Sequence, residues 1–128
     1  MKIGYVRGLK YGMVDFSTRF KILKNESLDK IYTDENGRDE YRKLLMELTE
    51  SDTLYIWSVE ELGQERDEIR EQWEIISKEI GAEIRVINCP VLQSGKDVSL
   101  TERMVSDVAL NVLSYQVEMI NKKLKDLR

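Results

Sequence analysis

Histidine is absent from these 128 residues, and cysteine and proline occur once each. Without histidine the chain lacks the usual acid–base side chain, a Cys–His nucleophile and an ordinary zinc site, so we expect neither a metal ion nor another cofactor. The single cysteine, Cys89, excludes an intramolecular disulfide and fits a location in the reducing cytoplasm. No apolar run approaches the roughly 18 residues of a membrane-spanning helix, so we expect no membrane contact.

An excess of positive charge is missing as well. The net charge is −4 and the pI is near 5.0, whereas nucleic-acid-binding domains usually carry a basic face. Residues 60–74 hold seven acids and only two arginines. This acidic segment is either a solvated helix face or a surface that repels DNA or engages a basic partner. The sequence therefore predicts that any contact with DNA is weak or indirect.

What the chain does contain is a regular alternation of strand and helix patterns. Asp15 is a suitable N-cap for the first helix, and Gly81 is a suitable C-cap residue for the third. Strands that alternate with helices predict an α/β fold with a largely parallel central sheet. We expect strands at 2–6, 28–34, 52–59 and 82–88, helices at 15–25, 39–50, 65–80 and 99–128, and a loop at 93–98.

The last helix is unusually long. Ser99 and Glu102 form a capping-box pattern at its start, and at 1.5 Å per residue the helix would span roughly 45 Å. It is apolar on more than one stripe. Either the helix packs only on its own sheet, or the surplus apolar surface is an oligomer interface. The candidates for a dimer interface are Met104, Val108, Val112, Tyr115 and Met119.

Several segments, taken in order, resemble the N-terminal catalytic domain of the serine recombinases, the resolvase/invertase family of site-specific DNA recombinases. They are KIGYVR (2–7), LDKIYTD (28–34), GRDEYRKLLMEL (37–48), DTLYIWSVEELGQ (52–64) and SYQVEMI (114–120). The resemblance implies a three-layer sandwich with a largely parallel central sheet. It also implies a resolvase-like domain over 1–98 and a long dimerisation helix of the same domain over 99–128. We expect no helix-turn-helix domain.

In that family, a serine after the first strand attacks a DNA phosphodiester while arginines neutralise the anionic transition state. Here Arg7 and Arg38 match two of those arginines, but the serine position falls on Leu9. The family's Asp-Arg pair is replaced by Glu60 and Glu61, and a later arginine is replaced by Gln64. The six positions therefore resemble a vestigial pocket from which the chemistry has been lost.

The favoured hypothesis is a catalytically inactive domain that acts through dimerisation as a regulator or partner of DNA recombination on a mobile element. Its partner would be a second copy or an active recombinase, and we expect no small-molecule ligand. One alternative is an active recombinase whose nucleophile is another hydroxyl, of which Tyr11 is the best placed. Another is a DNA-binding accessory subunit that uses the basic residues at the end of the long helix, namely Lys122, Lys123, Lys125 and Arg128.

Overall fold

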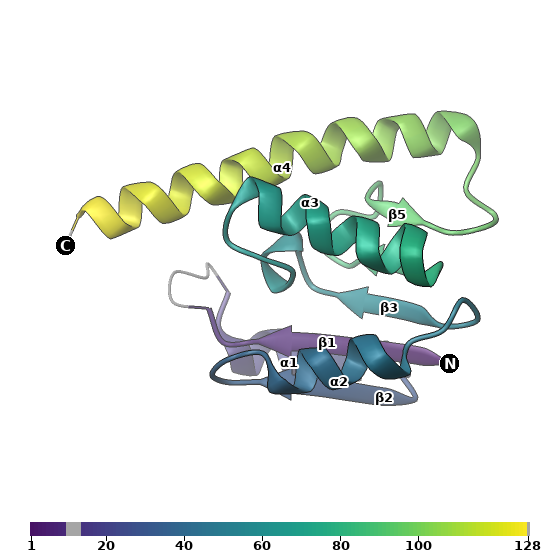
Figure 1. Cartoon of the computed structure of the whole chain (residues 1–128). Coiled ribbons are helices and arrows are strands. Elements are labelled where there is room, and N and C mark those ends of the chain that lie inside the picture. Colours follow the sequence, from purple (N-terminus) through teal and green to yellow (C-terminus); the bar gives the residue numbers. More distant parts are fainter. Residues whose placement is uncertain (10–13, 128) are drawn as a thin grey trace.

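Five strands form one sheet in the order β2-β1-β3-β4-β5 in the computed structural model of the chain (Figure 1). The structure describes residues 1–9 and 14–127. The first four strands run parallel, and the fifth is antiparallel to its neighbour. Their bounds are β1 (Lys2–Arg7), β2 (Lys30–Asp34), β3 (Thr53–Ile56), β4 (Glu83–Val86) and β5 (Gln93–Ser94).

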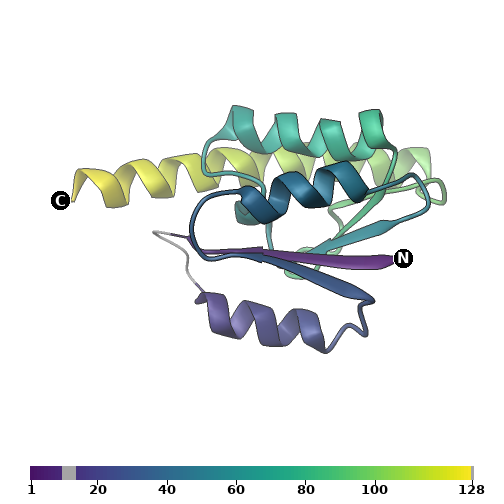
Figure 2. The same ribbon diagram turned by 60° about the horizontal axis from the view of Figure 1, so that its bottom comes forward.

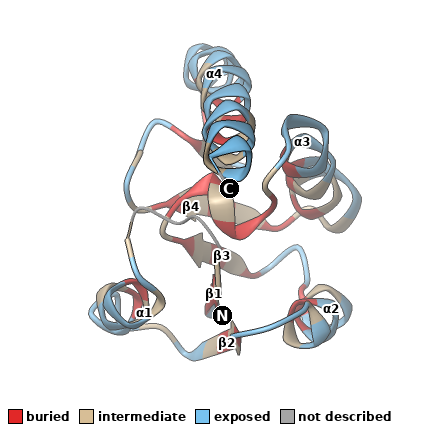
Figure 3. Cartoon of the chain, turned by 90° about the vertical axis from the view of Figure 1, so that its left-hand side faces the viewer, coloured by how far each residue is buried: buried red, intermediate tan, exposed pale blue. Residues whose placement is uncertain are grey.

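Helices cover both faces of this sheet, so the expected three-layer α/β fold is confirmed (Figure 2). One face carries α1, and the other carries α2 and α3, while α4 lies beside α3 at the β4 end of the sheet (Figure 3). The bounds are α1 (Phe16–Lys24), α2 (Asp39–Glu47), α3 (Arg66–Glu74) and α4 (Leu100–Asp126), with a short 3₁₀ turn η1 (Val59–Glu61) and a π-helical segment η2 (Ile75–Ile80).

Alternation along the central strands places the main core under α2 and α3. Leu54 and Ile56 on β3, and Ile84 on β4, are fully buried in one hydrophobic cluster with residues of both helices. Side chains two apart on a strand share a face, which is why these positions gather on one side of the sheet. The same cluster includes Leu110 and Val117 of α4, so the long helix is part of the core.

Local capping signals fix the ends of several helices as expected. The Asp15 side chain accepts a hydrogen bond from the backbone N–H of Thr18 at 2.8 Å. Ser99 and Glu102 form both bonds of the predicted capping box at the start of α4. Gly81 has φ +82° after η2, a left-handed conformation that glycine adopts without a Cβ penalty.

Three segments differ from the expectation. The predicted strand 52–59 ends at Ile56 because Ser58 caps η1, its hydroxyl accepting from the Glu60 N–H at 3.2 Å. The predicted helix 65–80 loses its α-helical register after Glu74 and continues as η2. The predicted loop 93–98 contains β5, which pairs with β4 and receives a 2.8 Å hydrogen bond from Arg85 Nη1 to the Ser94 carbonyl.

The long helix α4 has two different faces. One face is buried against the domain through Leu110, Val117 and two small residues, Ser106 and Ser114. This face packs mainly on α3. The opposite face is exposed, and the C-terminal part of the helix projects past the rest of the fold (Figure 1). The helix therefore packs on its own domain and still leaves apolar surface uncovered, and an oligomer interface on that surface stays a prediction. No helix in residues 1–9 and 14–127 is long and apolar enough to cross a membrane.

Candidate functional site

The candidate site lies where β1 and β3 end, at the carboxyl edge of the sheet. The strand order changes direction between these two strands, and open α/β sheets commonly bind ligands at such a point. Arg7 is the last residue of β1, and η1 follows β3 closely. Arg38 precedes α2 and donates from Nη1 and Nη2 to the carbonyls of Glu61 and Leu62, at 3.2 and 2.5 Å. The turn after β3 is thereby tied to the start of α2.

Asp34 at the end of β2 holds the other side of this edge together. Its carboxylate accepts hydrogen bonds from the Tyr5 hydroxyl at 2.8 Å and from the backbone N–H groups of Glu40 and Tyr41, each at 2.9 Å. An acid at a helix N-terminus satisfies free N–H groups and favours the helix dipole. Burial is the main cause that raises the pKa of Tyr5 well above its ordinary range, and the hydrogen bond to Asp34 raises it further. The Tyr5 hydroxyl therefore stays protonated.

Glu68 is the residue that closes the site. Its Oε1 lies 3.3 Å from Arg38 Nη2 and 3.9 Å from Arg7 Nη1, so one carboxylate of α3 faces both guanidinium groups. Burial lowers the pKa of Arg7, and the neighbouring charge of Arg38 lowers it further. The Nε and Nη1 of Arg7 are buried and make no hydrogen bond to any described residue. Two neighbouring cations thus share one carboxylate within 4.0 Å among the described residues, and this carboxylate is itself exposed to solvent.

Glu61 does not face an open pocket. It is fully buried, and its Oε1 forms a salt bridge with the equally buried guanidinium of Arg19 from α1. The same oxygen accepts a 3.3 Å hydrogen bond from the backbone N–H of Arg7. The sequence places Glu61 where the resemblance has a cationic arginine, and in the structure the charge of Arg19 faces that acid. Glu60 is half-buried beside it, and burial raises its pKa.

The remaining predicted residues are less closely joined. Leu9 is half-buried just after the β1 end, where Gly8 donates its N–H to the Asp34 carbonyl at 2.7 Å. A Cβ on Gly8 would collide with the Glu35 carbonyl oxygen, so this turn requires glycine. Gln64 is half-buried, and its backbone carbonyl accepts from Asn121 on α4 at 3.3 Å. The structure therefore brings Arg7, Arg38 and Glu61 together. Leu9 and Glu60 are near them along the chain, whereas Gln64 contacts α4.

The candidates outside this edge have simpler surroundings. Lys122, Lys123 and Lys125 are exposed on the projecting end of α4, while Tyr11 and Arg128 lie outside the described residues. The proposed interface residues Met104, Val108, Val112, Tyr115 and Met119 are all exposed, between 41% and 64%. The described part of the chain holds no cluster of three or more acidic or cysteine side chains suited to a metal ion.

Sequence reasoning missed Arg19 and Glu68. Arg19 occurs between the apolar residues of an amphipathic helix, and Glu68 is one acid among seven, so neither stands out from its local pattern. The only available signal was an unexplained acid, Glu61, at a position that the fold buries. A buried carboxylate needs a cationic or hydrogen-bonding partner, although the sequence does not say which one.

The buried pair makes the stability of the protein dependent on pH. Burial raises the pKa of Glu61 to about 7, above the ordinary value of 4.5 that it has in an unfolded chain. Between these values the folded state holds a proton that the unfolded state releases, so the free energy of unfolding falls as pH rises. We expect urea unfolding to show this loss between about pH 5 and pH 7, and Glu61→Gln to flatten it. An unchanged slope in Glu61→Gln would contradict the assignment.

Comparison with known proteins adds one finding. No protein-family model matches the sequence, and no curated protein matches it. Among solved structures, the chain is similar to the N-terminal catalytic domain of TP901-1 integrase, with a TM-score of 0.57 and 11% sequence identity over 100% of this chain and 99% of that one. At this identity the likeness shows the fold alone, an α/β fold with a mostly parallel sheet and a long C-terminal helix that matches the resolvase-like fold expected from the sequence.

Proposed function

We propose that this chain is a resolvase-like domain that does not cleave DNA and acts as a dimerising partner or regulator of DNA recombination on a mobile element. The observation that carries this proposal is the arrangement of Arg7, Arg38 and Glu68. Glu68 lies against both guanidinium groups, where a phosphate would need free cations. Leu9, after the β1 strand end, has no hydroxyl with which to attack phosphorus.

The exposed face of α4 supports the dimerisation part of the proposal. The five apolar residues from Met104 to Met119 are half-exposed or more in most cases, and they follow one another at helical spacing along one face. Exposed apolar surface on this scale commonly marks a protein interface. The occupant is a second copy of the chain, or an active recombinase with an equivalent helix. The link to DNA recombination rests on the fold shared with the integrase domain.

The inactive reading predicts that the protein forms no covalent adduct with DNA. After incubation with supercoiled DNA and denaturation, we expect no protein–DNA band for the wild type. We also expect none for Leu9→Ser. Arg7 and Arg38 would still face Glu68 and not the phosphate, and Glu61 and Gln64 occupy two positions where the family has arginines. An active serine recombinase in the same assay is the positive control.

Each other outcome identifies a rival function. An adduct with the wild type would show that the chain is a working recombinase with a nucleophile such as Tyr11, and would overturn the proposal. An adduct with Leu9→Ser alone would show that Glu68 does not block the site. A gel shift that is lost with added salt, together with no adduct, would favour a DNA-binding accessory subunit that uses Lys122, Lys123 and Lys125.

A further inference from the structure

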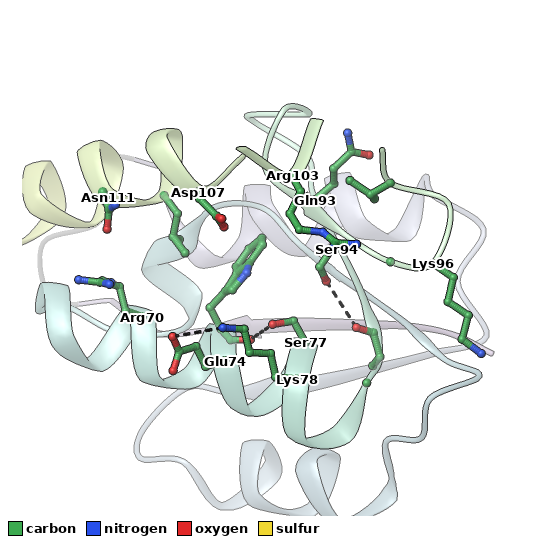
Figure 4. A pocket seen from close by; sticks show the side chains of 16 residues that line it. Arg70, Glu74, Ser77, Lys78, Gln93, Ser94, Lys96, Arg103, Asp107 and Asn111 are labelled. Atoms are coloured by element: carbon green, nitrogen blue, oxygen red, sulfur yellow. Dashed lines mark hydrogen bonds and ion pairs between the residues drawn. The ribbon is translucent and has the colours of Figure 1, made fainter. Parts of the chain in front are cut away.

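A groove of about 770 Å³ lies away from the Arg7–Arg38 edge, between α3 with η2 on one side and the N-terminal half of α4 on the other (Figure 4). The turn that carries β5 closes one end. Trp73 and Leu110, both members of the hydrophobic core, contribute its apolar lining. Its volume falls within the range of roughly 300–1,000 Å³ that is typical of small-molecule sites.

Positive side chains from four different segments line this groove, in a protein whose net charge is −4. They are Arg70 of α3, Lys78 of η2, Lys96 of the turn after β5 and Arg103 of α4. Two acids also line it, and one of them, Glu74, lies 3.9 Å from Lys78. Within the described part of the chain, Arg70, Lys96 and Arg103 form no ion pair within 4.0 Å. The other acid is Asp107, so the groove has an excess of positive charge.

Arg103 carries a positive charge at a position where the dipole of α4 disfavours one. It lies at the end of the first helical turn, where the helix dipole favours anions and opposes cations. A bound anion beside Arg103 would interact favourably with both the guanidinium and the helix start. Figure 4 shows Arg70 on the Asn111 side of the groove and Arg103 beside Ser94, with Glu74 and Lys78 below them, while Lys96 extends away from the others.

The backbone beside the groove is irregular as well. The π-helical η2 supplies Ser77 and Lys78 to the lining, and the Ser77 hydroxyl donates to the Trp73 carbonyl at 2.7 Å. Segments of π-helix are rare and are found frequently at functional sites. The irregular register, the unpaired cations and the cavity therefore coincide at one place in the fold.

We propose that this groove binds a small molecule with at least two negative charges, such as a diphosphate or a tricarboxylate. Arg103 holds one anionic group by charge-assisted hydrogen bonds, and the positive charge of Arg70 attracts the ligand from the α3 side of the groove. The proposal departs from the sequence expectation of no small-molecule ligand, because these cations come together only in the folded chain. It does not depend on whether the Arg7–Arg38 edge is catalytically active.

Isothermal titration calorimetry with inorganic pyrophosphate and, separately, with citrate tests the proposal at about 0.1 M salt. We expect saturable one-to-one binding of at least one of them, and a loss of affinity of about tenfold or more when Arg70→Gln and Arg103→Gln are combined. The matched control is Lys21→Gln/Lys24→Gln, which removes two exposed charges from α1 on the other face of the sheet. It should leave the affinity within about twofold, since exposed charges farther away than the Debye length of about 10 Å at 0.1 M salt are largely screened.

The two probes also distinguish the source of the charge. Binding of pyrophosphate alone indicates a phosphorylated ligand, and binding of citrate alone indicates a polycarboxylate. The proposal is overturned if neither probe binds at millimolar concentration, or if the α1 control weakens binding as much as the groove variant does. Circular dichroism of both double variants should match the wild type, since all four positions are exposed.

Discussion

Replacing Arg19 with methionine is expected to lower the free energy of unfolding by about 3–5 kcal/mol, the usual cost of removing one partner of a buried ion pair. The Arg19 side chain is only 2% exposed, and Glu61 is fully buried. Methionine would leave the Glu61 carboxylate without its counter-charge. Arg19 Nε also donates to the Val14 carbonyl at 2.9 Å, so the chain leading into α1 would lose a contact. Urea unfolding followed by circular dichroism measures the loss at about pH 8, above the Glu61 pKa of about 7, where the folded state holds the carboxylate.

Two further variants separate the ion pair from a general effect of losing an arginine. Arg42→Met removes a surface arginine that pairs with Asp39 at 3.1 Å, and it should change stability by less than about 1 kcal/mol. Arg19→Met/Glu61→Gln removes both charges and keeps an acceptor for the Arg7 N–H, so it should recover at least about half of the loss. A single Arg19→Met variant as stable as Arg42→Met would show that the pair contributes little.

The architecture could be predicted because its signals are local. The alternation of short apolar strands with amphipathic helices specifies the α/β class, and Ser99 with Glu102 specifies the start of α4. The amphipathic pattern also identified the exposed apolar positions on α4, since Leu110 and Val117 take the buried face. Each of these features depends on residues that are close together in the sequence.

The interior of the site could not be predicted because it depends on pairs far apart in sequence. Arg19 and Glu61 are separated by 42 positions, and Arg38 and Glu68 by 30. An arginine on a helix and an acid in an acidic segment both match the ordinary pattern of a solvated surface. Only the folded structure shows that these charges meet at the carboxyl edge of the sheet. Likewise, β5 exists because Gln93 and Ser94 meet β4, and nothing in a two-residue strand signals this in advance.

The second large effect is expected for self-association through α4. The five exposed apolar positions are spaced by four, four, three and four residues, so they form one continuous stripe. This spacing is nearly symmetric about Val112. In a two-fold pairing with the helices in opposite directions, Val112 would meet its own copy, Met104 would lie opposite the partner's Met119, and Val108 opposite the partner's Tyr115.

The energetics favour a dimer of moderate affinity. Full burial of such a side chain contributes roughly 1.5–3 kcal/mol, and about half of that remains available for residues that are already half-buried. Ten side chains, five from each copy, give a gross gain on the order of 10 kcal/mol. The association cost of 4–15 kcal/mol offsets much of it, so we expect a micromolar dissociation constant at best unless the rest of the domain also joins the interface. A closed two-fold arrangement is the commonest for such dimers.

Analytical ultracentrifugation of the wild type beside Val112→Glu/Met119→Glu tests this expectation. The charges would be placed in the apolar contact of each copy, and we expect the variant to remain monomeric at about 100 μM, well above a micromolar constant. Asp126→Lys/Lys125→Glu is a matched control, because it exchanges charges on the exposed end of the same helix and should leave the dimer intact. If the wild type is also monomeric at this concentration, a second copy of the chain is excluded as the partner that covers the exposed face of α4. An active recombinase would then be the partner to test.

The direction of the two helices can be decided separately in a Cys89→Ser background, which removes the native thiol. If the helices run in opposite directions, a mixture of Met104→Cys and Met119→Cys proteins should cross-link on mild oxidation, while either protein alone should not. Parallel helices would give the reverse, because each cysteine would then lie beside its own copy. Val112→Cys should cross-link in both arrangements, since a residue on a two-fold axis meets itself, and its failure to do so would place the contact elsewhere on α4.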